Sequence, residues 1–158
     1  IELLDEKDHG KFYSGDCYII VYTNALNKIM IYYWIGLKSS VDEKGTAAMK
    51  VVDMDNNLYS GHAVQVRVVE RKEPPHFMAL FRGEMMIFQG GYASGFKNHH
   101  DGQHNHQENY LLQIRGTNNY NTKAIEVDCK ASSLNSNDVF ILNTQNEIYI
   151  WIGEVNMK

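Results

Sequence analysis

The chain has 158 residues, room for one full domain or one and a fraction, and its hydrophobic content of 44% is enough for a packed core. A formal net charge of −4 without a basic stripe argues against a nucleic-acid surface, and no apolar run is long enough to cross a bilayer. The two cysteines, Cys17 and Cys129, lie in apolar stretches, which predicts buried free thiols and fits a reducing compartment.

A β-hairpin is predicted near the start of the chain, after a short edge strand within residues 1–13. The stretches 17–23 and 29–36 are rich in β-branched and aromatic residues, and the polar residues 24–28 between them are typical of a loop. The preceding Ser14-Gly15-Asp16 is a turn signal, which places a carboxylate where the first strand of the hairpin begins.

A long helix is predicted from Val41 to about Tyr59, because Ser40 and Glu43 have capping-box spacing and Ser60-Gly61 is typical of a helix end. Its apolar residues form two adjoining stripes that predict a face wide enough to lie on a sheet. The first stripe is Val41, Ala48, Val52 and Tyr59, and the second is Ala47, Val51, Met54 and Leu58.

The following stretches complete an α/β unit. Residues 64–69 alternate with period two and predict a strand with one solvated face. Pro74 and Pro75 open a short apolar helix at 76–81, and 85–89 is a further strand. The order hairpin, long helix, strand, short helix, strand predicts a central mixed β-sheet between one long and one short helix.

A polar stretch rich in Gly, Asn, His and Gln separates this unit from the rest and is predicted to be a linker at 92–109. Its histidines suggest zinc, but no cysteine or acidic residue has zinc-site spacing, so a solvated linker is the preferred interpretation. These histidines are His99, His100, His104 and His106. Beyond the linker, 110–115 and 123–127 predict strands.

The first hairpin pattern recurs near the end of the chain, in 134–142 and 148–153. Asp16 aligns with Asp138, and Trp34 with Trp151, so both tryptophans are predicted to be core aromatics. This internal duplication has domain spacing, too long a period for a solenoid. It predicts a repeat at 1–91 and the N-terminal part of a second repeat at 110–158, as in a fragment of a longer protein.

This combination resembles the gelsolin/villin family of actin-regulating proteins, and the order of its motifs is similar to a fifth repeat running into a sixth, with the villin branch closer. The motifs that carry the resemblance span nearly the whole chain. They are Phe12-Tyr-Ser-Gly-Asp-Cys-Tyr, Tyr33-Trp-Ile-Gly, Ser40-Val-Asp-Glu, Lys72-Glu-Pro-Pro-His-Phe-Met-Ala-Leu-Phe, Ile87-Phe-Gln-Gly-Gly and Leu134-Asn-Ser-Asn-Asp-Val-Phe.

The resemblance implies a Ca²⁺ site in each repeat, where the turn before the hairpin meets the start of the long helix. By position, Gly15 would supply a carbonyl, Asp16 a carboxylate and Glu43 a bidentate carboxylate. In the second repeat Asn137 would supply a carbonyl and Asp138 a carboxylate. From the pattern alone, without the resemblance, Glu43 is a capping residue and Asp16 a turn former.

The function implied by the resemblance is a calcium-regulated actin-binding module of a filament severing, capping or bundling protein. Its partners would be actin and neighbouring repeats, its location the cytoplasm and cytoskeleton, and it would not be an enzyme. Two alternatives remain open: a protein–protein scaffold module of the same fold without metal, and a cysteine hydrolase, which needs a base or acid close to Cys17.

Overall fold

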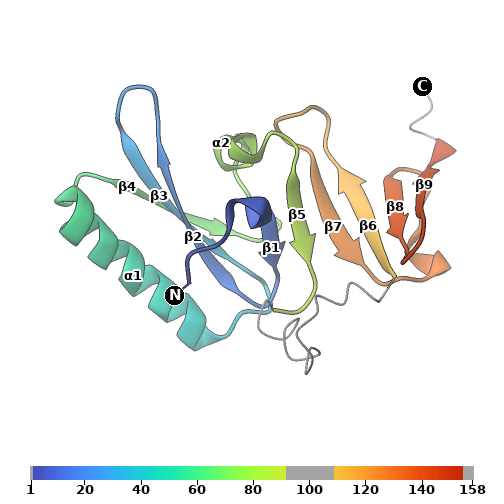
Figure 1. Cartoon of the computed structure of the whole chain (residues 1–158), viewed down its shortest axis with the longest axis horizontal. Coiled ribbons are helices and arrows are strands. Elements are labelled where there is room, and N and C mark those ends of the chain that lie inside the picture. Colours follow the sequence, from blue (N-terminus) through green and yellow to red (C-terminus); the bar gives the residue numbers. More distant parts are fainter. Residues whose placement is uncertain (1, 92–108, 155–158) are drawn as a thin grey trace.

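The computed structural model describes residues 2–91 and 109–154, so nearly all of the predicted linker and its four histidines lie outside the described residues (Figure 1). The elements, in chain order, are η1 (Glu6–Asp8), β1 (Lys11–Tyr13), β2 (Cys17–Thr23), β3 (Ile29–Ile35), α1 (Val41–Tyr59), β4 (Val64–Val69), α2 (Pro75–Met78), η2 (Ala79–Phe81), β5 (Met85–Phe88), β6 (Tyr110–Arg115), β7 (Lys123–Val127), η3 (Ala131–Ser133), β8 (Val139–Asn143) and β9 (Ile148–Ile152).

The predicted hairpin is confirmed as β2 and β3, which pair antiparallel from Cys17 opposite Ile35 to Thr23 opposite Ile29. Strand β4 pairs parallel with β3 after the crossover through α1. These three strands form one sheet in the order β2-β3-β4. The crossover helix is what a parallel pair of neighbouring strands requires.

Helix α1 begins and ends where the sequence predicts. The Ser40 hydroxyl accepts a hydrogen bond from the Glu43 N–H at 3.2 Å, and the Glu43 carboxylate accepts one from the Ser40 N–H at 2.7 Å, which completes the capping box. The buried line of the helix is Ala47, Val51 and Asp55. Both predicted apolar stripes are therefore wrong in part, since Val41 and Val52 of the first are 83% and 46% exposed and Leu58 of the second is 64% exposed.

The other strands form a second sheet of six strands, in the order β1-β5-β7-β6-β8-β9. The predicted α/β class, with a mixed sheet and one long and one short helix, is confirmed. However, the strands of the first repeat divide between two sheets. The reason is that β5 pairs in parallel with β1 on one side and with β7 on the other, so it joins the first repeat to the second.

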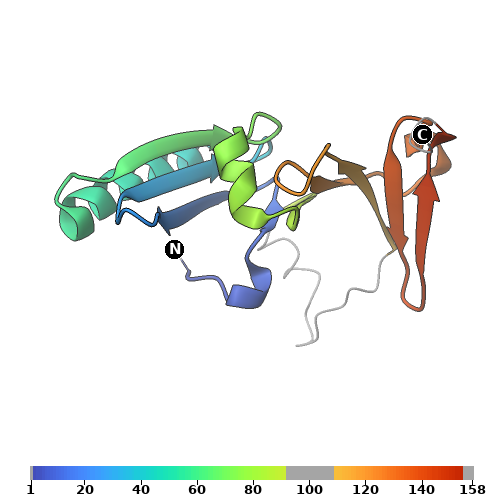
Figure 2. The same ribbon diagram turned by 90° about the horizontal axis from the view of Figure 1, so that it is seen from above.

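The main core lies between the three-stranded sheet and the segment formed by α2, β1 and β5, while α1 contacts β2 and β3 from the opposite face (Figure 2). Alternate residues of β3 serve the two faces, because successive side chains of a strand point in opposite directions. The core cluster consists of Phe12, Tyr32, Trp34, Val68, Phe77, Met78, Met85 and Ile87. No helix within the described ranges has the length and apolar character to span a bilayer.

The internal duplication is visible in the strand register. Tyr18 lies opposite Trp34 in the first hairpin, and Phe140 lies opposite Trp151 in the second. The surroundings differ, because β9 is the outermost strand of its sheet. Trp151 is consequently 38% exposed while Trp34 is fully buried, so the prediction of a second core tryptophan is wrong.

The prediction that Cys129 is a buried thiol is also wrong, since this residue is exposed in the turn after β7.

Candidate cation site

The turn at 14–16 is held against the loop that leads into α1. The Gly36 N–H donates to the Asp16 carbonyl at 3.0 Å, and the Lys38 N–H donates to the Ser14 carbonyl at 2.8 Å. A Cβ atom on Gly36 would lie 2.2 Å from the Ser14 carbonyl oxygen, so this close approach of two backbones requires glycine. The turn that carries Gly15 and Asp16 is thus joined, backbone to backbone, to the loop that precedes the helix of Glu43.

A buried carboxylate lies behind this junction. Glu70 follows β4 and is only 2% exposed. Its Oε2 atom accepts a hydrogen bond from the Ser14 hydroxyl at 2.5 Å and another from the Leu37 N–H at 2.7 Å. Hydrogen bonds to an ionised acceptor are short and strong, so a single oxygen atom fixes both loops.

Glu43 lies in the first turn of α1, directly after this loop, and its carboxylate caps the helix by accepting from both the N–H and the hydroxyl of Ser40. Burial raises the pKa of the Cys17 thiol, and the negative charge of Glu43 raises it further. A nucleophilic cysteine needs a lowered pKa, so this environment disfavours the cysteine hydrolase alternative.

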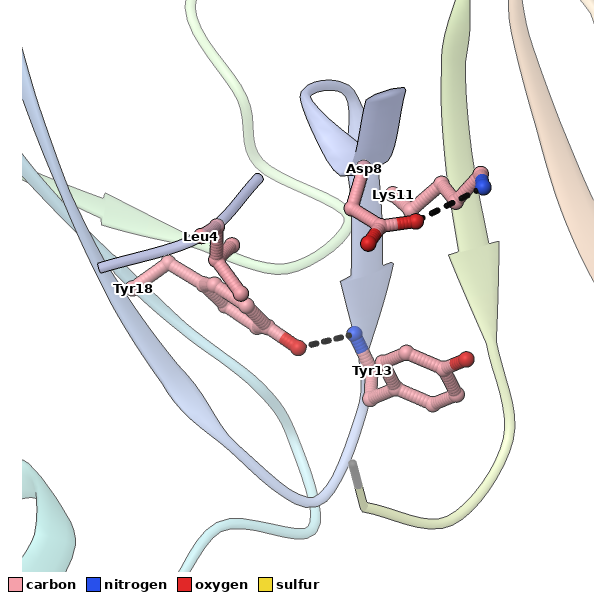
Figure 3. A pocket seen from close by; sticks show the side chains of 5 residues that line it. All are labelled: Leu4, Asp8, Lys11, Tyr13 and Tyr18. Carbon is pink, nitrogen blue, oxygen red and sulfur yellow. Dashed lines mark hydrogen bonds and ion pairs between the residues drawn. The ribbon is translucent and has the colours of Figure 1, made fainter. Parts of the chain in front are cut away.

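The Asp16 carboxylate faces Tyr18 and the residues that follow β5. The Tyr18 hydroxyl donates to Asp16 Oδ2 at 3.4 Å and accepts from the Tyr13 N–H at 3.1 Å. Tyr13 and Tyr18 also line a small cavity of about 20 Å³ beside β1 (Figure 3). Burial raises the pKa of Tyr18, so this hydroxyl stays a donor. A Cβ atom on Gly91 would lie 3.0 Å from Asp16 Oδ1, which leaves little room for a side chain there.

The donor set of the first turn suits calcium. A carbonyl at Gly15 and carboxylates at Asp16 and Glu43 are all hard oxygen ligands, and Ca²⁺ completes its six to eight ligands with further carbonyls and waters. Among the residues that the structure describes, no group of three or more His, Cys, Asp or Glu side chains is placed to hold a metal. A site here would therefore depend on two carboxylates together with backbone and water oxygens.

The second turn repeats the backbone arrangement but not the surroundings of the carboxylate. The Gly153 N–H donates to the Asp138 carbonyl at 3.1 Å, as Gly36 does to Asp16. Asp138 Oδ2 accepts from the side-chain amides of Gln113 at 2.5 Å and Asn135 at 2.8 Å, and the Arg115 guanidinium lies 4.0 Å away. With Asn137 beside it, this turn offers one carboxylate, already surrounded by donors.

Comparison with known proteins accounts for this repeated arrangement. The sequence profile of the gelsolin repeat matches residues 3–78 and 121–157. The chain belongs to the gelsolin family. It is 46% identical over 158 residues to cytoplasmic gelsolin from Homarus americanus. That alignment covers 98% of this chain and 21% of the Homarus protein. It is 44% identical over 149 residues to advillin from Mus musculus, covering 92% of this chain and 18% of that protein.

The chain thus spans about a fifth of the length of these gelsolin-family relatives, 21% in one and 18% in the other. A solved complex described as Thorarchaeota 2DGel3 with rabbit actin aligns over 97% of this chain and 72% of that chain, at 31% identity and a TM-score of 0.46.

Sequence reasoning on this gelsolin-family chain missed two residues that shape the first turn, Tyr18 and Glu70. In the sequence, Tyr18 is one of several aromatic residues in a predicted strand. The role of its hydroxyl depends on a hydrogen bond from Tyr13 of β1, which the sequence pattern does not predict. Glu70 follows an alternating strand and reads as a solvated charge, although it is buried against a residue 56 positions earlier. The one local signal for Glu70 is its position: it is an acidic residue directly after β4, a strand that contributes to the core.

Proposed function

We propose that this chain is a calcium-regulated actin-binding module of a gelsolin/villin-type protein that severs, caps or bundles filaments. Support comes from the family membership and from the junction of the 14–16 turn with the loop that precedes α1. In this proposal the chain comprises one repeat at 1–91, a linker at 92–109 and part of a second repeat at 110–158. It works in the cytoplasm on the actin cytoskeleton, beside neighbouring repeats, and not as an enzyme.

Gly15, Asp16 and Glu43 would hold the ion in the first repeat, and Asn137 and Asp138 would contribute to a second site. The ion would supply a positive charge that ties the 14–16 turn to the start of α1. A ligand that binds one arrangement of the repeats more tightly than another favours that arrangement, and this would make the module calcium-responsive. Two charged ligands with carbonyls and waters suggest sensor-like affinity, with a Kd of about 10⁻⁵ M.

Glu43→Gln tests the metal site without removing the helix cap, because glutamine also completes a capping box. The unmodified chain should gain about 2.7 kcal/mol in free energy of unfolding when calcium is at about 100 times its Kd. Glu43→Gln should lose most of this gain, as the neutral amide is a poor calcium ligand. The measurement is thermal unfolding in calcium and in chelator.

Ser40→Ala is the matched control, since it weakens the cap but leaves the Glu43 carboxylate in place. It should lower the melting temperature in chelator and keep the calcium-induced rise. A calcium-induced rise that survives Glu43→Gln at full size would rule out the assigned ligand.

An exposed apolar surface on α1 gives the actin part of the proposal a physical basis. Val41, Met49 and Val52 are 83%, 72% and 46% exposed. By helix geometry Met49 lies opposite the buried line of α1, and Val41 and Val52 lie on its flank. Met49 and Val52 are three residues apart and so lie next to each other on the helix. Exposed apolar side chains gathered in this way are typical of a protein–protein contact.

Met49→Glu should weaken co-sedimentation with filamentous actin by about tenfold, because a charge would be desolvated in the contact. Leu26→Glu is the control: Leu26 is 78% exposed and belongs to the loop between β2 and β3. Figure 1 shows this loop away from α1. Equal binding by Met49→Glu and the unmodified chain would remove this face from the proposal.

The metal-free scaffold is the second candidate, and one observation favours it. Each carboxylate proposed as a ligand already contacts the protein: Glu43 at its own helix cap, Asp16 at Tyr18 and Asp138 at Gln113. A scaffold of this fold would show no heat of calcium binding in calorimetry at neutral pH and no calcium-induced stabilisation.

A further inference from the structure

We infer that Glu70 is a positioning residue for the first cation site: its buried carboxylate holds the turn that carries Gly15 and Asp16 in register with the loop that leads to Glu43. This inference rests on the proposed calcium function and names a residue outside the ligand set.

The first step is the geometry of the contact. The Ser14 hydroxyl and the Leu37 N–H donate to the same atom, Glu70 Oε2, at 2.5 and 2.7 Å. Ser14 directly precedes Gly15 and Asp16, and Leu37 belongs to the loop between β3 and α1. One oxygen atom therefore joins the turn that carries Gly15 and Asp16 to the loop that precedes the helix of Glu43.

The second step is the rigidity of the anchor. The Glu70 N–H donates to the Ile35 carbonyl at 3.0 Å, which continues the pairing of β3 and β4 beyond the end of both strands. Ser14 and Glu70 are each 2% exposed, so water does not compete for their hydrogen bond. The carboxylate thus extends from a paired backbone into a closed site.

The third step is that Glu70 acts outside the proposed ligand set. Its Oε2 atom already accepts from the Ser14 hydroxyl and the Leu37 N–H, so its assigned role is to hold the two loops. Residues that orient metal ligands without touching the metal typically change affinity by 10–100-fold when they are substituted.

Glu73 provides a control three residues away on the same turn. Its side chain is 1% exposed, but it accepts from the Trp34 indole N–H at 3.1 Å and pairs with Lys123 at 2.6 Å, at the junction with β7. Glu70→Gln and Glu73→Gln thus make the same chemical change at two buried carboxylates, of which only one contacts the cation-site loops.

The experiment measures the Kd for Ca²⁺ by calorimetry in the unmodified chain and in both variants, with amide hydrogen exchange at Leu37 in chelator as a metal-free readout. Glu70→Gln should weaken the Kd at least tenfold and speed exchange at Leu37, because an amide oxygen accepts these two bonds less strongly than a carboxylate. Glu73→Gln should leave both quantities within twofold.

Calcium binding that is unchanged by Glu70→Gln, or weakened equally by Glu73→Gln, would overturn the positioning role. An unmodified chain that binds no calcium would instead refute the proposed function, so the two failures are distinguishable. If Glu70→Gln does not fold, Ser14→Ala replaces it, since it removes one of the two contacts and should weaken the Kd in the same direction.

Discussion

Gly36→Ala is expected to destabilise the chain by about 3 kcal/mol. The added Cβ atom would clash with backbone atoms, and no movement of a side chain can relieve that clash. The atom would lie 2.2 Å from the Ser14 carbonyl oxygen and 2.8 Å from the Asp16 carbonyl oxygen. Both are backbone atoms of the turn that would carry the calcium ligands. The substitution should therefore separate the turn from the α1 loop and remove calcium binding together with stability.

Denaturant unfolding and calcium calorimetry of Gly36→Ala measure the two losses. Gly45→Ala is the control, because nothing lies within 4 Å of a Cβ built at this exposed position of α1. Alanine is the better helix former, so Gly45→Ala should stabilise the chain by about 0.5–1 kcal/mol. A Gly36→Ala variant as stable as the unmodified chain would show that the two backbones do not approach this closely.

The second repeat contains the same close approach between a glycine and the turn that precedes its hairpin. A Cβ atom on Gly153 would lie 2.3 Å from the Ser136 carbonyl oxygen, and one on Gly36 would lie 2.2 Å from that of Ser14. The duplicated Trp-Ile-Gly pattern therefore has a common physical cause. In both hairpins the glycine lets the end of the second strand approach the turn that precedes the first.

Local signals explain which parts of the fold the sequence predicts. The bounds of α1 follow from the capping box at Ser40 and the helix stop at Ser60-Gly61, and both depend on residues within a few positions of each other. The division of the strands between two sheets does not follow, because it depends on β5 pairing with β7 across the segment 92–109.

The two tryptophans illustrate the limit of pattern reasoning. Trp34 and Trp151 occupy matching positions in matching strands, but β3 has β4 beside it and Trp34 packs in the core against Phe12, whereas β9 is an edge strand. For the candidate site, the motif identifies Gly15, Asp16 and Glu43, whose ligand roles stay predictions. It does not identify Glu70, because that contact appears only when distant segments are folded together.

Lys123→Met is expected to cost about 3–5 kcal/mol, the second large effect, because it leaves the Glu73 carboxylate buried without its cationic partner. Lys123 Nζ lies 2.6 Å from Glu73 Oε2, and the two side chains are 16% and 1% exposed. The pair connects the turn after β4 to β7, beside the β5–β7 pairing. Its loss should weaken the pairing of β5 with β7, which joins the two repeats, and amide hydrogen exchange at Ala124 and Ile125 should become faster.

Lys130→Met is the matched control, since Lys130 pairs with Asp128 at the same 2.6 Å but the two side chains are 58% and 74% exposed. Exposed pairs contribute little, so this variant should stay within about 0.5 kcal/mol of the unmodified chain. The double variant Glu73→Gln with Lys123→Met removes both charges and should be more stable than Lys123→Met alone. If the double variant were the less stable of the two, the cost would come from lost packing at β7 rather than from an unpaired buried charge.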